Sequence, residues 1–375
     1  MKQYSLSRRK LLIALGVGAV SAPLLTRQWW LNESRDVPLF ITANDDNAGN
    51  HYVSGFDAKG HKHFQLSTDL RGHGLVVNPA QKHRALMFAR RPGTVAYEID
   101  LKQSEMGTLI DCAPGRHFFG HGCYSLDGQT LYTSENDYEN GRGVIVVRDS
   151  SDYRILNEFS SHGIGPHEIR LLSDGKTLVV ANGGIQTHPD YPRKKLNLST
   201  MQPALSYIDV ENGQLLGEYR PDNHQLSIRH LDVSQDDRVM AIMQYQGAKT
   251  DKVPLVALHH GEDQLQPLMA DEQTQVAMNQ YTASACINSE NGIAGVTCPR
   301  GNLVTFWDTR QGHFIKALEI KDAGGIALAA DGRFVITTGR GEVHRISTTT
   351  LTADRSPLKL AETRCDNHLS IAMSV

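Results

Sequence analysis

The chain has 375 residues, enough for two ordinary domains or one large β architecture, so length alone does not decide the fold class. Its formal net charge of −3 at pH 7 argues against a nucleic-acid-binding protein that relies on a basic surface, and we expect no nucleic-acid partner. The 17 histidines are the unusual feature, because imidazole is the commonest protein ligand of transition metals.

Residues 1–30 have the composition of a targeting segment. Arg8 and Arg9 precede an apolar run over residues 11–25 that is too short to span a membrane comfortably. The arginine pair resembles a twin-arginine signal, which implies export to the periplasm; a chance pair in an ordinary secretory signal is the alternative. Pro23 disfavours cleavage nearby, and an uncleaved segment is the only membrane association that we expect.

One sequence unit recurs from residue 38 onward: a short apolar run, a turn and a second apolar, β-rich run. Copies begin near residues 73, 121, 167, 230, 285, 325 and 368, at intervals of roughly 40 to 63 residues that are typical of four-stranded propeller blades. Most copies carry a strong hairpin signal between the two runs. These signals are Asp127-Gly128, Asp174-Gly175, Asp236-Asp237, Asn291-Gly292 and Asp331-Gly332. The pattern predicts an all-β fold, a seven-bladed β-propeller of the YVTN or WD type over residues 38–375.

The last copy contributes a single strand after His368 and then the chain reaches Val375. The other strands of that blade are available near the N-terminus, in the runs 39–42, 52–55 and 64–66. A blade made from both termini closes the ring and removes two exposed sheet edges. We therefore expect the last blade to be closed by both ends of the chain, and the protein to be a monomer.

Five cysteines would permit two disulfides in an oxidising compartment, with one thiol left over. Cys286 and Cys298 flank the turn at Asn291-Gly292, so we expect them on neighbouring strands. The sequence contains no Cys-x-x-Cys-His, and covalent c-type haem is not expected.

The longest interval between copies holds an insertion over residues 183–203. Three prolines, paired glycines and a basic triplet predict a loop. It follows the second strand of its blade, so we expect it to cover the channel mouth and to bring His188, Asp190 and Arg193 to a bound ligand. A solvated connector without a function is the alternative.

The first strand of each propeller blade lines the central channel, and five of the seven copies begin with histidine. These are the candidate metal ligands: His73, His121, His167, His230 and His368. The other two copies have Ala285 and Gly325, whose small size we expect to leave a gap. Such a ring would bring several nitrogens within reach of one transition metal, iron or copper. The alternative is that each histidine bonds within its own blade as a relic of the repeat.

Charged residues accompany these histidines along the chain. Arg71, Glu168 and Arg229 lie within two residues of a blade histidine, and Arg90 and Arg91 end a second strand at the same end of the barrel. A mouth with both charge signs fits an anionic ligand or a chelated metal. Solvated rim charges are the alternative. The candidate ligand-binding residues are thus Arg71, Glu168, His188, Asp190, Arg193 and Arg229.

The mature chain resembles an uncharacterised family of exported bacterial propellers, often encoded beside imelysin-like iron-regulated proteins and di-haem oxidoreductases. The blade histidines and the loop over residues 183–203 carry this resemblance. It implies a role in periplasmic iron acquisition, with iron-uptake proteins as partners, but no assigned active site. More distantly, the architecture is similar to the propellers of amine dehydrogenase heavy chains and of nitrous oxide reductase. The latter holds a copper cluster on axial histidines, but this chain lacks that enzyme's extra copper domain.

Three functions follow from these observations. The first is a non-catalytic periplasmic propeller that binds iron or an iron-bearing ligand. The second is a metal-dependent oxidoreductase or hydrolase that uses the same histidines. The third is a protein-interaction scaffold with structural histidines. The sequence has no nucleophile elbow, Walker loop or dinucleotide fingerprint, which weakens the enzyme hypothesis without excluding it.

Overall fold

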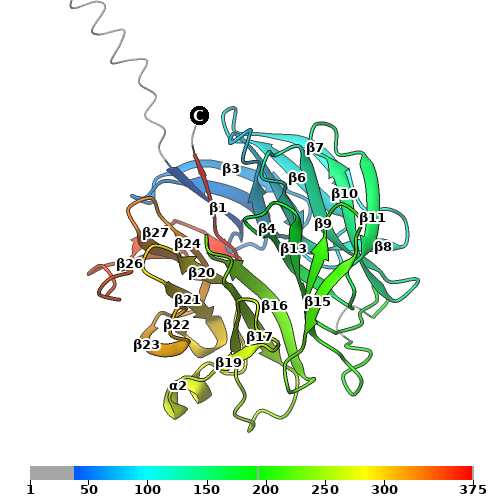
Figure 1. The fold of residues 1–375 in the computed structure, drawn as a ribbon. Coiled ribbons are helices and arrows are strands. Elements are labelled where there is room, and N and C mark those ends of the chain that lie inside the picture. The colour runs from blue at the N-terminus through cyan, green and yellow to red at the C-terminus, as the bar shows by residue number, and fades with distance from the viewer. Residues whose placement is uncertain (1–37, 192–193, 374–375) are drawn as a thin grey trace, which may run out of the picture. The chain divides into compact units, whose positions relative to one another are not determined.

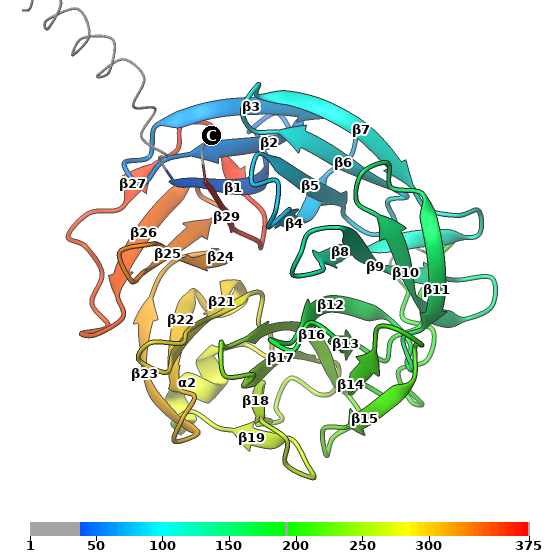
Figure 2. The ribbon, with the colours of Figure 1, turned by 45° about the horizontal axis from the view of Figure 1, so that its top comes forward.

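The computed structural model describes residues 38–191 and 194–373, so the predicted signal segment lies outside the described part of the chain. Seven antiparallel sheets follow one another and form a ring around a central channel (Figure 1, Figure 2). The prediction of a seven-bladed β-propeller is therefore confirmed. Within the described residues, no helix is both long and apolar enough to cross a membrane.

Six of the blades are runs of four consecutive strands that are hydrogen-bonded in chain order, with the first strand nearest the channel (Figure 2). The first three are β4 (Gly72–Val77), β5 (Arg84–Ala89), β6 (Val95–Asp100) and β7 (Glu105–Asp111); β8 (Arg116–Tyr124), β9 (Thr130–Asp137), β10 (Arg142–Asp149) and β11 (Ile155–Ser160); and β12 (Pro166–Leu171), β13 (Thr177–Asn182), β14 (Ala204–Asp209) and β15 (Leu215–Tyr219). The next three are β16 (Leu226–Val233), β17 (Val239–Tyr245), β18 (Val256–His259) and β19 (Gln266–Leu268); β20 (Ala285–Asn288), β21 (Ile293–Cys298), β22 (Leu303–Asp308) and β23 (His313–Glu319); and β24 (Ala323–Leu328), β25 (Arg333–Thr338), β26 (Glu342–Ser347) and β27 (Leu358–Lys359). A short helix, α2 (Glu272–Ala277), precedes β20, and a 3-10 turn, Pro299–Gly301, follows β21.

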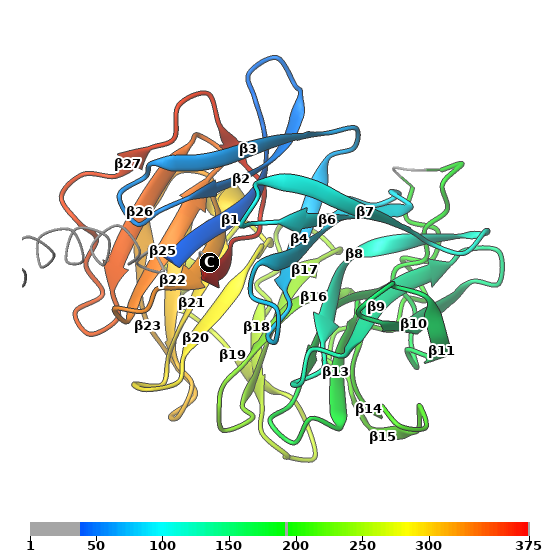
Figure 3. The same ribbon diagram turned by 90° about the horizontal axis from the view of Figure 1, so that it is seen from above.

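The remaining blade combines both ends of the described chain, as the incomplete last repeat predicts. Its N-terminal strands are β1 (Pro38–Asp45), β2 (His51–Phe56) and β3 (Lys62–Thr68). The C-terminal strand β29 (Ser370–Met373) pairs antiparallel with β1, and β28 (Arg364–Cys365) pairs with the far end of β1. Figure 3 shows the end of the chain beside β1. Both termini therefore close the ring.

The predicted turns between first and second strands adopt the backbone conformation that their sequences favour. Gly128, Gly175, Gly292 and Gly332 have φ angles of 70°, 68°, 73° and 75°, in the left-handed region where glycine meets no Cβ penalty. Asp237 takes the same conformation, with φ of 63°, in the copy that lacks glycine.

The core lies between the blades, where neighbouring sheets bury their faces against each other. Phe88 of β5 packs on Phe118 of β8 with ring centroids 5.4 Å apart, and both rings are fully buried. Phe306 and Phe334 stack between two other blades, with ring centroids 6.0 Å apart. Such pairs add about 0.5–1.5 kcal/mol to the free energy of area burial, so adjacent blades stabilise each other.

No disulfide forms among the five cysteines, all of which lie in the described residues. Cys286 and Cys298 lie on neighbouring strands, as expected, but the register pairs Cys286 with Gly295 instead. Burial raises the pKa of the Cys123 and Cys365 thiols to about 12, which leaves them unreactive.

Deleting residues 366–375 removes β29 and leaves the inner edge of β1 unpaired. We expect this truncation to lower the soluble fraction and the thermal midpoint, because an opened ring exposes sheet edges that pair with other chains. Removing only residues 374–375 keeps β29 and is the control. Equal solubility and stability of the two truncated chains would contradict closure by the C-terminus.

Candidate metal centre

The inner strands are irregular where they carry the predicted histidines. In four blades the pairing of first and second strands shifts register beside the histidine, as at a β-bulge. The shifts lie at Gly72/Leu75, Phe118/Gly122, Pro166/Ile169 and Ile228/His230. Because an extra residue changes the direction in which side chains point, these bulges account for imidazoles that face the axis. His167 lies within the shift between Pro166 and Ile169.

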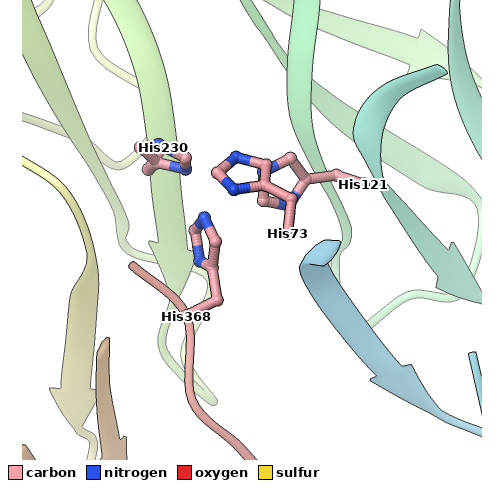
Figure 4. Close-up of side chains that lie close together, drawn as sticks. All are labelled: His73, His121, His230 and His368. Atoms are coloured by element: carbon pink, nitrogen blue, oxygen red, sulfur yellow. The ribbon is translucent and has the colours of Figure 1, made fainter. Parts of the chain in front are cut away.

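Four of the five predicted histidines converge on the axis from four different blades. One ring nitrogen from each of His73, His121, His230 and His368 lies within 4.8 Å of the other three (Figure 4). The ring of His368 lies 4.5 Å from that of His73 and 4.7 Å from those of His121 and His230, centroid to centroid. All four side chains are buried. We call these four residues the histidine cluster.

His167 flanks the histidine cluster. Its ring centroid lies 4.6 Å from that of His230 and 4.9 Å from that of His121, but it does not belong to the mutually close group of four. All five predicted histidines thus lie together, but only the four of the histidine cluster are close enough to one another to share one ion.

Asp366 fixes the orientation of His73. Its Oδ1 accepts a hydrogen bond from Nδ1 of His73 at 2.9 Å, and its Oδ2 accepts from Arg71 at 2.9 Å and Arg90 at 2.8 Å. This carboxylate is almost completely buried, and the sequence analysis missed it. Its only sequence signal is its position two residues before His368. With Nδ1 bound to Asp366, the Nε2 lone pair of His73 is free to bind a metal.

Glu168 has the same relation to His230. Its Oε2 lies 3.2 Å from Nδ1 of His230 and accepts a hydrogen bond from the backbone N–H of Leu231, also at 3.2 Å. Arg170 forms an ion pair with its other oxygen at 2.5 Å. Of the residues predicted to bind a ligand, Arg71 therefore holds the carboxylate that orients His73, and Glu168 itself orients His230.

The other two members of the histidine cluster each have a buried nitrogen without a partner. Nε2 of His121 and Nε2 of His368 make no hydrogen bond to any described residue. A buried polar atom left unsatisfied costs roughly 1–3 kcal/mol, which a bound metal would offset. Tetrahedral coordination at about 2.0–2.1 Å separates imidazole nitrogens by about 3.4 Å, so each ring would move inward by about 1 Å to share one ion.

Burial also keeps these imidazoles in the form that binds metals. It lowers the pKa of His73 to about 4, against the attraction of Asp366, and it lowers the pKa values of His121, His167 and His368 well below the ordinary value. The proximity of the rings adds to this effect, because each charged ring would repel its neighbours. At neutral pH the rings of His73, His121, His167 and His368 are therefore uncharged, as metal binding requires.

Close approach of the backbone requires glycine beside His73 and His121. A Cβ atom on Gly74 would lie 2.3 Å from the backbone oxygen of Gly120. A Cβ atom on Gly120, which has φ of 96°, would lie 2.6 Å from Cδ2 of His73. Gly325, by contrast, does not leave the gap that its size suggested. A Cβ there would lie 2.7 Å from the carbonyl carbon of His368, because the C-terminal segment fills this space.

A cavity of about 130 Å³ adjoins the histidine cluster. Its wall includes His73, His167 and His230, and it is otherwise polar and basic. The other lining residues are Arg90, Arg91, Phe119, Arg229, Gln244, Tyr281 and Asn367. Burial and then the charge of Arg91 lower the pKa of Arg229 to about 9. Of the predicted ligand-binding residues, Arg229 is the one that lines this cavity.

Comparison with known proteins places the chain among uncharacterised propellers. Residues 66–372 match the model of a family described as "Protein of unknown function (DUF1513)". The chain belongs to this family. No curated protein matches it significantly. A solved structure, the hydrazine synthase of Kuenenia stuttgartiensis, is similar with a TM-score of 0.61 and 12% identity over 83% of this chain and 90% of that one. At this identity the likeness supports the fold alone.

In this DUF1513 propeller, the loop over residues 183–203 reaches the arginine side of the channel, but its described residues, 183–191 and 194–203, contribute nothing to the cavity wall. Lys195 donates a hydrogen bond to Gln246, and the nearby charges of Arg229, Arg300 and Arg91 add to burial in lowering its pKa. His188 packs on Tyr138 with ring centroids 5.0 Å apart, and Asp190 is exposed. Arg193 lies outside the described residues. Ligand binding by these three residues stays a prediction.

We predict that the metal-free protein loses stability as the pH falls from 6.5 towards 4. In the unfolded chain His73 titrates near 6.5, whereas its folded pKa is about 4, so the folded state binds fewer protons over this window. The free energy of unfolding should therefore be fully retained above pH 6.5 and fall as the pH approaches 4, and His73 alone should contribute up to about 3 kcal/mol to this loss. Urea unfolding at pH 7.0, 5.5 and 4.5 (roughly spanning the window) measures it.

His73→Gln should reduce this pH dependence, whereas the same change at the exposed His61 should not. Identical pH dependence in the wild type and His73→Gln would show that His73 is not the titrating group.

Proposed function

We propose that this protein is a metal-binding propeller of the bacterial periplasm, in which His73, His121, His230 and His368 hold one transition-metal ion. The observation that carries the proposal is the convergence of four buried imidazoles, two of which donate their other N–H to buried carboxylates. Carboxylate–histidine pairs of this kind set the tautomer and orientation of metal-binding imidazoles.

The contacts of the histidines argue against a purely structural role. A relic of the repeat would bond within its own blade, as His117 does when its Nδ1 meets the carbonyl of Phe118. His73 instead pairs with Asp366, almost 300 residues away, and His230 pairs with Glu168 of the preceding blade. Nε2 of His121 and Nε2 of His368 are buried and have no hydrogen-bond partner in the described protein. In a scaffold protein these atoms would lower the free energy of unfolding without serving a function.

The donor set is compatible with iron, copper, zinc or nickel, since imidazole suits all of these metals. We favour iron, because the sequence resembles propellers encoded beside iron-regulated proteins. The proposed role is then to bind iron, or an iron-bearing ligand, during periplasmic iron acquisition together with iron-uptake proteins. Copper is the alternative, by analogy with the propeller of nitrous oxide reductase, whose axial histidines hold a copper cluster.

A catalytic function is the second candidate, favoured by the cavity that adjoins His73 and His230. A metal with one coordination position open to a cavity can activate water or bind a substrate, as an oxidoreductase or hydrolase requires. A stoichiometric metal supports both functions, and turnover on added substrates then separates them.

We expect protein exported in its native host to contain about one metal ion per chain by elemental analysis, because one cluster offers one set of ligands. His121→Ala should weaken metal affinity by more than about 100-fold, because losing a ligand costs more than losing a residue that only orients one. His117→Ala is a matched control, because it removes another buried imidazole from the same strand, β8. Metal affinity unchanged in His121→Ala would overturn the proposal and leave the interaction scaffold as the leading function.

Asp366→Asn and Glu168→Gln should each lower metal affinity by about 10- to 100-fold while retaining one site. The amides have nearly the same shape as the carboxylates but no charge to hold an imidazole N–H. Metal titration against a chelator of known affinity measures the change. Asp263→Asn, at an exposed aspartate outside the site, is the control. Wild-type affinity in both carboxylate variants would show that these carboxylates do not support the site.

A further inference from the structure

The cavity beside the histidine cluster has a composition that metal binding alone does not explain. Three guanidinium groups line it, from Arg90 and Arg91 after β5 and from Arg229 in β16. Among the described residues, no carboxylate lines the wall. Gln244, Tyr281 and Asn367 add amide and phenol groups that can donate hydrogen bonds. The lining is therefore that of an anion site.

Two of these arginines lack the partners that buried charges normally have. Arg229 is 8% exposed, and its Nε bonds to no described residue. Nη1 of Arg91 is likewise buried without a partner in the described chain. Neither side chain forms an ion pair with a carboxylate of residues 38–191 or 194–373, whereas Arg90 pairs with Asp366. A buried guanidinium without a counter-charge is costly, and an anion would offset this cost.

The charge balance around the proposed metal leads to the same conclusion. Its four ligands are neutral imidazoles, so the ion would bring its full positive charge. The two carboxylates that contact these imidazoles are already engaged with arginines: Asp366 with Arg71 and Arg90, and Glu168 with Arg170. A cation added here increases an excess of positive charge unless an anion enters with it.

We propose that this cavity binds a small anion, a carboxylate or an oxyanion, between the guanidinium groups of Arg91 and Arg229 and the metal held by the histidine cluster. A cavity of about 130 Å³ admits an anion of a few heavy atoms or the acidic end of a larger chelator. The contact with the metal rests on the proposed function, whereas the arginine site stands without it. Because His73 and His230 line the same cavity, the anion and the metal would stabilise each other's binding by the same factor.

The test is calorimetric titration of the full-length protein with oxalate and, separately, with inorganic phosphate. Oxalate represents a carboxylate source and phosphate a free oxyanion. The metal-free protein should bind at least one of them, and Arg91→Gln and Arg229→Gln should each weaken that binding by about tenfold or more, because each removes a charged hydrogen-bond donor. Arg340→Gln makes the same charge change at an exposed arginine outside the cavity. Thermal unfolding confirms that each variant is folded, and the two cavity variants provide independent tests.

The protein loaded with Co²⁺ should bind the same anion more tightly, with a change in the visible absorption of the metal. If metal binds but both cavity variants bind oxalate and phosphate as the wild type does, the anion site is wrong and the metal site stands. If no metal binds but anion binding depends on Arg91 and Arg229, the proposed function fails and the anion site stands. Absence of binding of both anions in the metal-free and Co²⁺-loaded wild type overturns the inference.

Discussion

Pairing of β29 with β1 is the constraint on which the rest of the molecule depends, because the segment that closes the ring also completes the site. Asp366 and His368 lie between β28 and β29. The backbone N–H of Asp366 donates to the carbonyl of Ala43, and the hydroxyl of Thr42 donates to the carbonyl of His368, each at 2.8 Å. The N-terminal strand thus positions one proposed ligand and the carboxylate that orients another. The histidine cluster is therefore complete only when the last blade has formed.

The cluster is costly to the fold that contains it. Three features of the site reduce the free energy of unfolding. They are the imidazole nitrogens without hydrogen bonds, the interrupted pairing of the inner strands and the guanidinium groups without a counter-charge. The blades outside the channel compensate with apolar sheet faces packed from blade to blade. A binding function predicts a site that lowers the free energy of unfolding while it is empty, because a ligand that binds the folded state raises this free energy again.

The blades could be predicted from sequence because their turns carry a local signal, a residue able to adopt positive φ between two apolar runs. The histidines could be predicted because they recur at one place in that repeat. Asp366 could not, because its partner His73 is nearly 300 residues away and the two meet only when the ring closes. The separation of His167 from the other four depends on the direction that each bulge gives its side chain. Likewise, the sequence predicts Arg91 and Arg229 near the channel mouth, but only the folded arrangement of the blades shows that they line the same cavity.

The channel is asymmetric on the two sides of the histidine cluster, and this asymmetry decides what can reach it. The side lined by His121, Glu168, Arg170 and Ala285 holds a cavity of only about 40 Å³, in which the charges of Glu168 and Arg170 neutralise each other. Ala285 thus leaves a gap, as expected, but one suited to water. The arginine-lined cavity on the side of His73 and His230 is about three times larger and has unbalanced positive charge. Because Arg91 and Arg229 line this larger cavity, an anion is favoured there over a free cation. The imidazoles of the histidine cluster do not neutralise the charge of a bound metal. An anion in the adjoining basic cavity would therefore balance that charge.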